Sequence, residues 1–203
     1  MTSSGKKYAL IAGSISITAL LIVGVCWIVS ENSRNMKKPD PVTGSPRQAV
    51  NFFVSNTMDG LTKKDKYEFF KDYLDTHYST ESAKSLSDAL SKLSDKDVRR
   101  MQDNIIDAMA GGVLRYAENF NTATSEKEKQ QIVNQLMAEV DKYDSFAHQI
   151  IDLTPNVKKN APTSSSEAFN QIMKRLPPAE IAKMEPLLIR CAQKRLAGVA
   201  SRK

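Results

Sequence analysis

The sequence predicts an all-α protein, in which one N-terminal transmembrane helix is followed by a linker and a helical domain. Three observations support this class. Residues 8–30 contain no charged side chain, apolar residues after Pro46 recur at helical spacing, and no stretch alternates apolar and polar residues over the length of a strand. We expect the domain to be a multi-helix bundle or an irregular helical array of about six to seven helices.

Length and composition agree with this organisation. The 203 residues give room for one domain of ordinary size and an appendage. Charged residues make up 26% of the chain and aromatic residues 7%, which suits a helical globular domain and is too apolar for disorder throughout. With 29 Lys and Arg against 23 Asp and Glu, the chain is only mildly basic.

Residues 8–30 are the predicted transmembrane helix, and residues 1–7 form a short head before it. At about 1.5 Å per residue, roughly 20 residues cross the hydrocarbon core of a bilayer. Tyr8 and Trp27 lie near the ends of the segment, where amphipathic rings anchor a helix at the membrane surface. Two alternatives stay open: a cleaved signal peptide, which needs a shorter apolar run, and a lipoprotein signal that uses Cys26.

The charges on either side of this segment determine its orientation only weakly. Lys6 and Lys7 favour a cytoplasmic N-terminus, whereas Arg34, Lys37 and Lys38 favour the reverse. Because a short head usually stays inside, we expect a signal-anchor protein of the plasma or inner membrane whose C-terminal domain lies on the non-cytoplasmic side. Small residues spaced four apart in the segment also allow a homodimer through the membrane helix.

Residues 31–46 form the predicted flexible linker, because they hold three prolines, a glycine and mostly polar side chains. The helical domain follows as residues 47–203. Its helices are expected to start after Ser or Thr residues whose hydroxyl groups accept a hydrogen bond from a free backbone N–H group. The predicted N-caps are Ser45, Thr62, Ser94 and Ser125.

The predicted helices follow in chain order and are separated by short turns. They begin near Pro46, Thr62, Thr80, Ser94, Glu126, Ala168 and Pro178. Gly60 is expected to end the first helix, and residues 154–166 are expected to form the longest internal loop. Gly111 and Gly112 lie inside the helix that follows Ser94. Glycine in a helix interior costs about 1 kcal/mol, so the pair indicates a bend or a close helix contact.

Two parts of the domain resemble each other, since Lys92–Ile106 and Arg175–Ile189 match in their apolar and charged positions. The similarity extends to units of about 80–121 and 163–200. Each unit is predicted to contain a short helix, a tight corner and a longer helix. This pattern indicates a repeated way of starting a helix, with duplication of a helical hairpin as one version of it, more than a shared binding motif.

The corner of each unit explains most of the matched positions. Asp97 and Glu180 lie in the first turn of the longer helix, where a carboxylate can reach back to free N–H groups and suits the positive end of the helix dipole. Pro186 is a difference between the copies. We expect it to kink the last helix or to divide it.

No catalytic, cofactor-binding or metal-binding constellation is predicted. The two histidines, His77 and His148, lie far apart, and Cys191 and Cys26 cannot pair within one chain. The sequence has no Gly-rich phosphate loop and no nucleophile elbow. We therefore expect no enzyme and no cofactor; a catalytic site assembled across helices is kept as a third hypothesis.

The last helices carry a possible basic interaction surface. Its members are Lys174, Arg175, Lys183, Arg190, Lys194, Arg195, Arg202 and Lys203. The other side of the final helix is an apolar stripe that includes Met184, Leu188, Cys191 and Leu196. Such a helix packs its stripe on the bundle, or it binds anionic lipid or an acidic polymer. Nucleic acid is the least expected partner, because no aromatic residue follows Phe169 to stack on bases.

Two functional hypotheses lead from these observations. The first is a membrane-anchored, non-enzymatic protein whose helical domain binds another protein as an accessory or scaffold component. The second is a domain whose basic C-terminal helix binds anionic lipid or an acidic polymer. The sequence indicates neither the identity of the partner nor the biological process.

Overall fold

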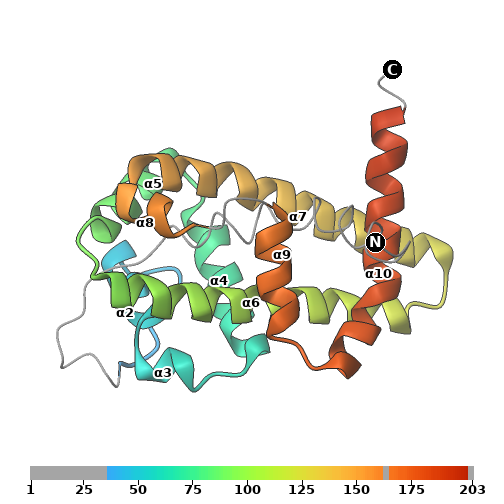
Figure 1. Cartoon of the computed structure of the whole chain (residues 1–203), viewed down its shortest axis with the longest axis horizontal. Coiled ribbons are helices and arrows are strands. Elements are labelled where there is room, and N and C mark those ends of the chain that lie inside the picture. The colour runs from blue at the N-terminus through green and yellow to red at the C-terminus, as the bar shows by residue number, and fades with distance from the viewer. Residues whose placement is uncertain (1–35, 162–164, 201–203) are drawn as a thin grey trace.

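The computed structural model describes residues 36–161 and 165–200, and these residues form helices and no strand (Figure 1). The all-α class is therefore confirmed. The described helices are α2 (Pro46–Phe53), α3 (Asn56–Asp59), α4 (Lys63–His77), α5 (Thr80–Leu90), α6 (Asp95–Thr122), α7 (Glu126–Leu153), α8 (Pro155–Asn160), α9 (Ser165–Lys174) and α10 (Pro178–Ala200). The predicted number of helices is too low, because α3 and α8 are separate short helices where the sequence indicates a helix end and a loop.

The predicted transmembrane helix, with Tyr8 and Trp27, lies outside the described residues, as do the head before it and the first part of the linker. Over residues 36–161 and 165–200, no helix combines the length and the apolar character that crossing a bilayer requires. The membrane segment thus stays a prediction from the sequence.

The second half of the predicted linker lies against the domain. Met36 packs on the hydrophobic core, and the Lys38 ammonium group lies 5.6 Å from the centre of the Phe69 ring. Nε2 of His77 is 2.9 Å from the carbonyl oxygen of Pro41. These contacts form because the segment carries an apolar side chain and a tight turn that fit the side of α4. Residues 36–46 thus contact the helical domain, and its predicted start at residue 47 stays a prediction.

All four predicted N-cap residues precede helices, at α2, α4, α6 and α7, and each hydroxyl group accepts the backbone N–H group three residues later. Capping boxes close at Ser45 and Ser125, where the side chains of Gln48 and Glu128 reach back to the cap residue. At Ser94 the geometry differs from the expectation. The Asp97 carboxylate accepts the Ser94 hydroxyl at 2.6 Å in place of a backbone N–H group.

The glycine pair in α6 allows α4 to cross it closely. A Cβ atom on Gly111 would lie 2.1 Å from the carbonyl oxygen of Lys63, and one on Gly112 would lie 2.6 Å from the Tyr67 ring. A side chain at Gly111 would therefore displace the backbone of α4, and one at Gly112 would displace the Tyr67 ring. Of the two predicted alternatives, the close helix contact is confirmed.

Helix α10 continues through Pro186, so of the two expected effects, a kink or a division, the division does not occur. Proline has no N–H group to donate to the preceding turn. In that turn, the Asn121 side chain donates to the carbonyl oxygen of Lys183 at 2.9 Å and so ties α10 to the end of α6. Met184, Leu188 and Cys191 are buried against the bundle, as the apolar stripe predicts.

The two repeat-like units correspond to α5–α6 and α9–α10, and each has the predicted order of a short helix, a corner and a longer helix. Their corners are used differently. Glu180 does not cap its helix; its carboxylate lies 3.1 Å from Nζ of Lys63 and joins the start of α10 to the start of α4. The units also contact each other, since Arg175 pairs with Asp103 of α6. Whether they arose by duplication stays a prediction.

Candidate functional site

The predicted basic surface is partly used to hold the last two helices in place. Arg175 contacts Asp103, Arg190 contacts Glu126, Lys194 contacts Asn134, and Arg195 lies 3.2 Å from Asp141. These pairs reach α6 or α7 and are exposed, so each contributes little to stability. Lys174 and Lys183 are exposed, while Arg202 and Lys203 lie outside the described residues. The basic side of α10 therefore faces the acidic side chains of α7 over part of its length.

A second apolar side of α10 is left uncovered. Ile189 and Leu196 keep 39% and 52% of their surface exposed. They are two helical turns apart and so lie on the same side of the helix. The sequence places Leu196 in the packed stripe, and this expectation is wrong. Figure 1 shows that the C-terminal part of α10 rises past the body of the domain.

A groove of about 290 Å³ lies beside this exposed side of α10. Phe120 of α6 and Pro186 of α10 contribute apolar surface, and Glu126, Lys129, Arg190 and Gln193 contribute polar surface. The groove is open to solvent. Together with Ile189 it forms an uneven apolar surface with cations at its edge, at one end of the molecule.

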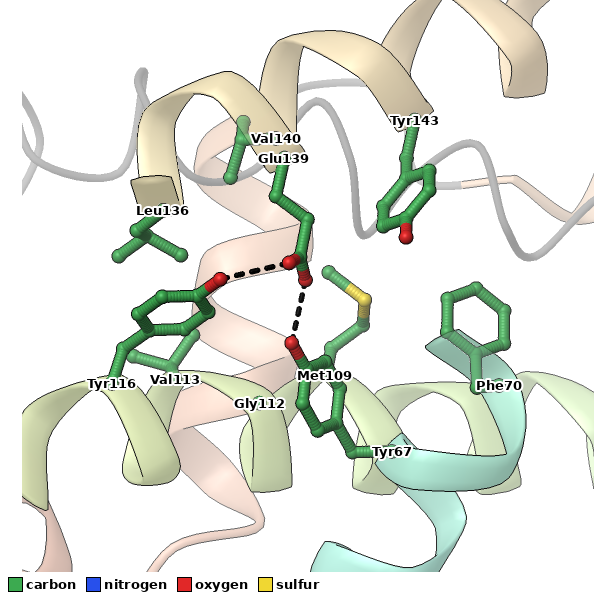
Figure 2. Close-up of a pocket in the computed structure, with 10 residues that line it drawn as sticks. All are labelled: Tyr67, Phe70, Met109, Gly112, Val113, Tyr116, Leu136, Glu139, Val140 and Tyr143. Atoms are coloured by element: carbon green, nitrogen blue, oxygen red, sulfur yellow. Dashed lines mark hydrogen bonds between the residues drawn. The ribbon is translucent and has the colours of Figure 1, made fainter. Parts of the chain in front are cut away.

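A second candidate is a polar cluster between α4, α6 and α7, shown in Figure 2. The carboxylate of Glu139 accepts two hydrogen bonds, from the Tyr67 hydroxyl at 2.6 Å and from the Tyr116 hydroxyl at 2.8 Å. Nζ of Lys71 lies 3.8 Å from the same carboxylate. Each of the three helices thus contributes at least one member of the cluster.

The cluster continues to Asp75 at the far end of α4. This carboxylate accepts hydrogen bonds from the Tyr143 hydroxyl at 2.6 Å, from Lys142 at 2.7 Å and from Lys71. Partial burial alone would raise the pKa of Asp75, but these hydrogen bonds and the charge of Lys71 outweigh it and lower the pKa to about 2. Asp75 is therefore ionised at neutral pH, and it keeps Lys71 protonated.

The space inside the cluster is too small for a substrate. The cavity measures about 20 Å³, which is enough for one water molecule, whereas ligand pockets measure roughly 300 Å³ or more. Apart from the hydroxyls and Glu139, its walls are apolar, with Phe70, Met109 and Val140 among them. The arrangement joins three helices by buried hydrogen bonds, and it offers no room for a reacting group.

The tyrosines of the cluster act as donors and not as bases. Burial raises the pKa of Tyr67, Tyr116 and Tyr143, and the neighbouring carboxylates raise it further. Burial alone raises the pKa of Tyr73, whose hydroxyl has no hydrogen-bond partner in the described part of the chain. All four hydroxyls therefore stay protonated well above neutral pH.

These pKa shifts predict a steep loss of stability in alkali. Above pH 10 the four tyrosines ionise in the unfolded chain but not in the folded one, so the unfolded state binds fewer protons and stability falls as pH rises. Each tyrosine adds up to about 1.4 kcal/mol per pH unit to the slope. We expect their ultraviolet ionisation signal to appear together with the loss of helical circular dichroism in an alkaline titration.

The matched variant for this titration is Tyr73→Phe, which removes one such tyrosine without breaking a hydrogen bond. It should lower the alkaline slope and keep the stability at neutral pH. Ionisation of all four tyrosines while the helical signal stays intact would contradict the buried arrangement.

The remaining reactive side chains do not form a site in the described residues. No group of three or more His, Cys, Asp and Glu residues is placed there to hold a metal ion. His77 lies against the Tyr73 ring and Pro41, and His148 is exposed on α7. Cys191 is almost fully buried, and burial raises the pKa of its thiol to about 11, so it is a packing residue with little thiolate.

Sequence reasoning did not identify either candidate in full. The three cluster tyrosines fall on predicted apolar faces, and their hydroxyl partners are not visible in the sequence. A usable signal is the position of Glu139, which lies next to Val140 and one turn from both Leu136 and Tyr143 on the buried side of its helix. A carboxylate at such a position needs buried donors. For the uncovered side of α10, the spacing of Ile189 and Leu196 is the usable signal.

Comparison with known proteins adds no relative from which a function could be transferred. No family model, no curated protein and no solved structure matches the chain.

Proposed function

We propose that the protein is a single-pass membrane protein whose helical domain binds another protein through the exposed side of α10, as an accessory or scaffold component. One observation carries this proposal: Ile189 and Leu196 are exposed on the same side of a helix that stands at one end of the domain, next to an open groove.

The exposed apolar side of α10 lacks the free energy that burial of its side chains would provide. A large apolar side chain left in water loses the roughly 1.5–3 kcal/mol that burial provides, and a partner that covers it recovers this free energy. The apolar positions are spaced as in helix-in-groove recognition, where a few anchors two turns apart dominate the contact. Arg190 and Lys129 at the groove edge are paired with Glu126, so the rim offers polar groups of both charges around the apolar patch.

The interior cluster supports a binding function over a catalytic one. It gathers titratable groups from three helices, and its cavity takes one water molecule. A catalytic site would need space for a substrate within hydrogen-bond distance of these groups.

The membrane part of the proposal rests on the sequence. Residues 8–30 carry no charge, and Tyr8 and Trp27 lie where interfacial rings are expected. With the N-terminal head inside, the helical domain lies on the non-cytoplasmic side of the plasma or inner membrane, where α10 meets its partner.

The experiment uses the full chain, purified from its native membrane in mild detergent. We expect Ile189→Glu with Leu196→Glu to abolish co-purification of the partner, because the two carboxylates replace the apolar anchors. The matched control is Val42→Glu with Leu153→Glu, which changes two other exposed apolar residues away from α10. The helical circular dichroism of both double variants should equal that of the unchanged protein.

Co-purification that survives the change on α10 would contradict the proposal. Loss of the partner in both double variants would also contradict it, because the effect would then not depend on α10.

A further inference from the structure

We infer that the α2 end of the domain faces the membrane that anchors the chain, and that Lys37, Lys38 and Arg47 form a basic surface there for anionic lipid headgroups. The inference rests on the proposed membrane anchor and adds to it which surface meets the lipid. It also separates the lipid-facing surface from the partner-binding surface on α10.

The connection between the predicted membrane segment and the domain is short. The predicted membrane segment ends at Ser30, and the chain is attached to the domain from Met36 onward, where it packs on the core. Only residues 31–35 are left between them. Even when fully extended, the six Cα–Cα steps from Ser30 to Met36 span no more than about 22 Å. The start of the domain is therefore held close to the headgroups.

The start of the domain is firmly attached. The carbonyl oxygen of Pro41 lies 2.9 Å from Nε2 of His77, and the Lys38 ammonium group lies over the Phe69 ring. The Asp40 carboxylate accepts the backbone N–H groups of Val42 and Thr43, at 2.7 and 3.1 Å. Residues 36–44 thus continue the domain surface up to α2, and they do not lengthen the tether.

The surface near the start of α2 carries more cations than carboxylates. Lys37, Lys38 and Arg47 are exposed around the start of α2. The exposed Asp40 carboxylate keeps its negative charge while it accepts two backbone N–H groups, and the three cations outnumber it. Exposed cations are attracted to an anionic leaflet when they lie within about 10 Å of it, which the short tether permits.

The α10 end of the molecule lies away from the tether. Figure 1 shows α2 and α10 at opposite ends of the longest axis of the molecule. A tether at the α2 end leaves α10 free to point away from the bilayer. The cations Arg190 and Arg195 of α10 are already paired with α7. The lipid surface is thus at the α2 end, whereas the sequence alone placed it on the C-terminal helix.

The test measures the distance of each end from the bilayer in the full chain, reconstituted in nanodiscs of phosphatidylcholine with phosphatidylglycerol. A donor dye is attached through Val42→Cys in one sample and Gln193→Cys in another, both in the Cys26→Ser background, and the acceptor is a headgroup-labelled lipid. Cys191 is 1% exposed and stays unlabelled. We expect higher energy transfer from position 42 than from position 193.

The charge arm uses Lys37→Glu with Arg47→Glu, which should reduce energy transfer from position 42 in the anionic nanodiscs. The same variant should cause no change in nanodiscs of phosphatidylcholine alone. The matched control is Lys64→Glu with Lys127→Glu, which makes the same change of charge at exposed positions of α4 and α7 and should leave the transfer unchanged.

Three outcomes would overturn the inference, and they can be told apart. Equal transfer from both positions, or higher transfer from position 193, would show that the α2 end does not face the bilayer. No effect of the charge variant would show that headgroup charge does not hold it there. A chain that fails to enter nanodiscs and is extracted from membranes by alkaline carbonate would remove the anchor itself and with it the proposed function.

Discussion

Gly111→Ala is expected to lower the free energy of unfolding by about 3 kcal/mol or more, because the position has no room for a methyl group. The added Cβ atom would lie 2.1 Å from the carbonyl oxygen of Lys63 and 2.5 Å from its carbonyl carbon. These are backbone atoms at the start of α4 and cannot rotate away. The two helices must therefore separate, although alanine itself favours the helix by about 1 kcal/mol.

Separation of α4 from α6 would also strain the contacts on either side of the crossing. Nζ of Lys66 is almost fully buried and lies 2.7 Å from the Asp107 carboxylate across the same pair of helices. A shift that lengthens this contact leaves a buried ammonium group without its partner, which is costly. Urea unfolding followed by far-ultraviolet circular dichroism measures the combined effect.

The matched control is Gly60→Ala. Gly60 has a right-handed helical backbone conformation, and a Cβ atom there would meet its nearest neighbours at 3.6 and 3.7 Å, which is ordinary contact. We expect no loss of stability, or a gain of about 0.4–1 kcal/mol from the smaller entropy of the unfolded chain. Equal effects of the two substitutions would contradict the close approach of α4 and α6.

Glu139→Ala is expected to lower the free energy of unfolding by about 3 kcal/mol. It removes the acceptor of the Tyr67 and Tyr116 hydroxyls, and a buried hydroxyl without a partner costs about 1–3 kcal/mol. It also leaves Lys71 without one of its two carboxylates. The same unfolding experiment measures the loss.

Two further variants show whether the hydrogen bonds are responsible. Adding Tyr67→Phe to Glu139→Ala should cost less than the sum of the two single changes, because both remove the same hydrogen bond. Glu118→Ala, an exposed glutamate on α6, should change stability by less than about 0.5 kcal/mol. Strict additivity of the first pair would contradict the arrangement drawn in Figure 2.

The local features of the fold could be predicted from the sequence because they depend on neighbours in the chain. Ser45 and Ser125 cap their helices through groups three residues away, and the apolar spacing around Met184 and Leu188 marks a buried face. Even the glycine pair of α6 carries a signal, since glycine is otherwise unfavourable inside a helix.

The features that involve two distant segments could not be predicted in the same way. Whether Glu180 caps its own helix or reaches Lys63 depends on how α10 lies on the bundle, and the sequence supports both. The partners of Glu139 are 23 and 72 positions away in the chain. The sequence shows two apolar sides on α10 and does not indicate which of them the bundle covers; Met184, Leu188 and Cys191 are buried, whereas Ile189 and Leu196 on the other side are exposed.

The two candidate sites differ in whether their side chains already have partners within the protein. The Tyr67–Glu139–Tyr116 cluster is satisfied internally, so it contributes to stability and leaves nothing unpaired for a ligand. The exposed side of α10 is unsatisfied, because Ile189 and Leu196 remain in contact with water. For this reason the cluster is best explained by its role in the fold, and we propose the exposed side of α10 as the binding surface.

The measurement that tests this assignment most directly is position-specific photo-crosslinking in the native membrane. A photo-reactive side chain is placed at position 196 of α10 and, in a matched sample, at position 153, where Leu153 is exposed to a similar degree at the end of α7. We expect one protein partner to be crosslinked at position 196 and none at position 153. Crosslinks only to lipid at position 196, or the same products at both positions, would contradict a protein-binding role of α10.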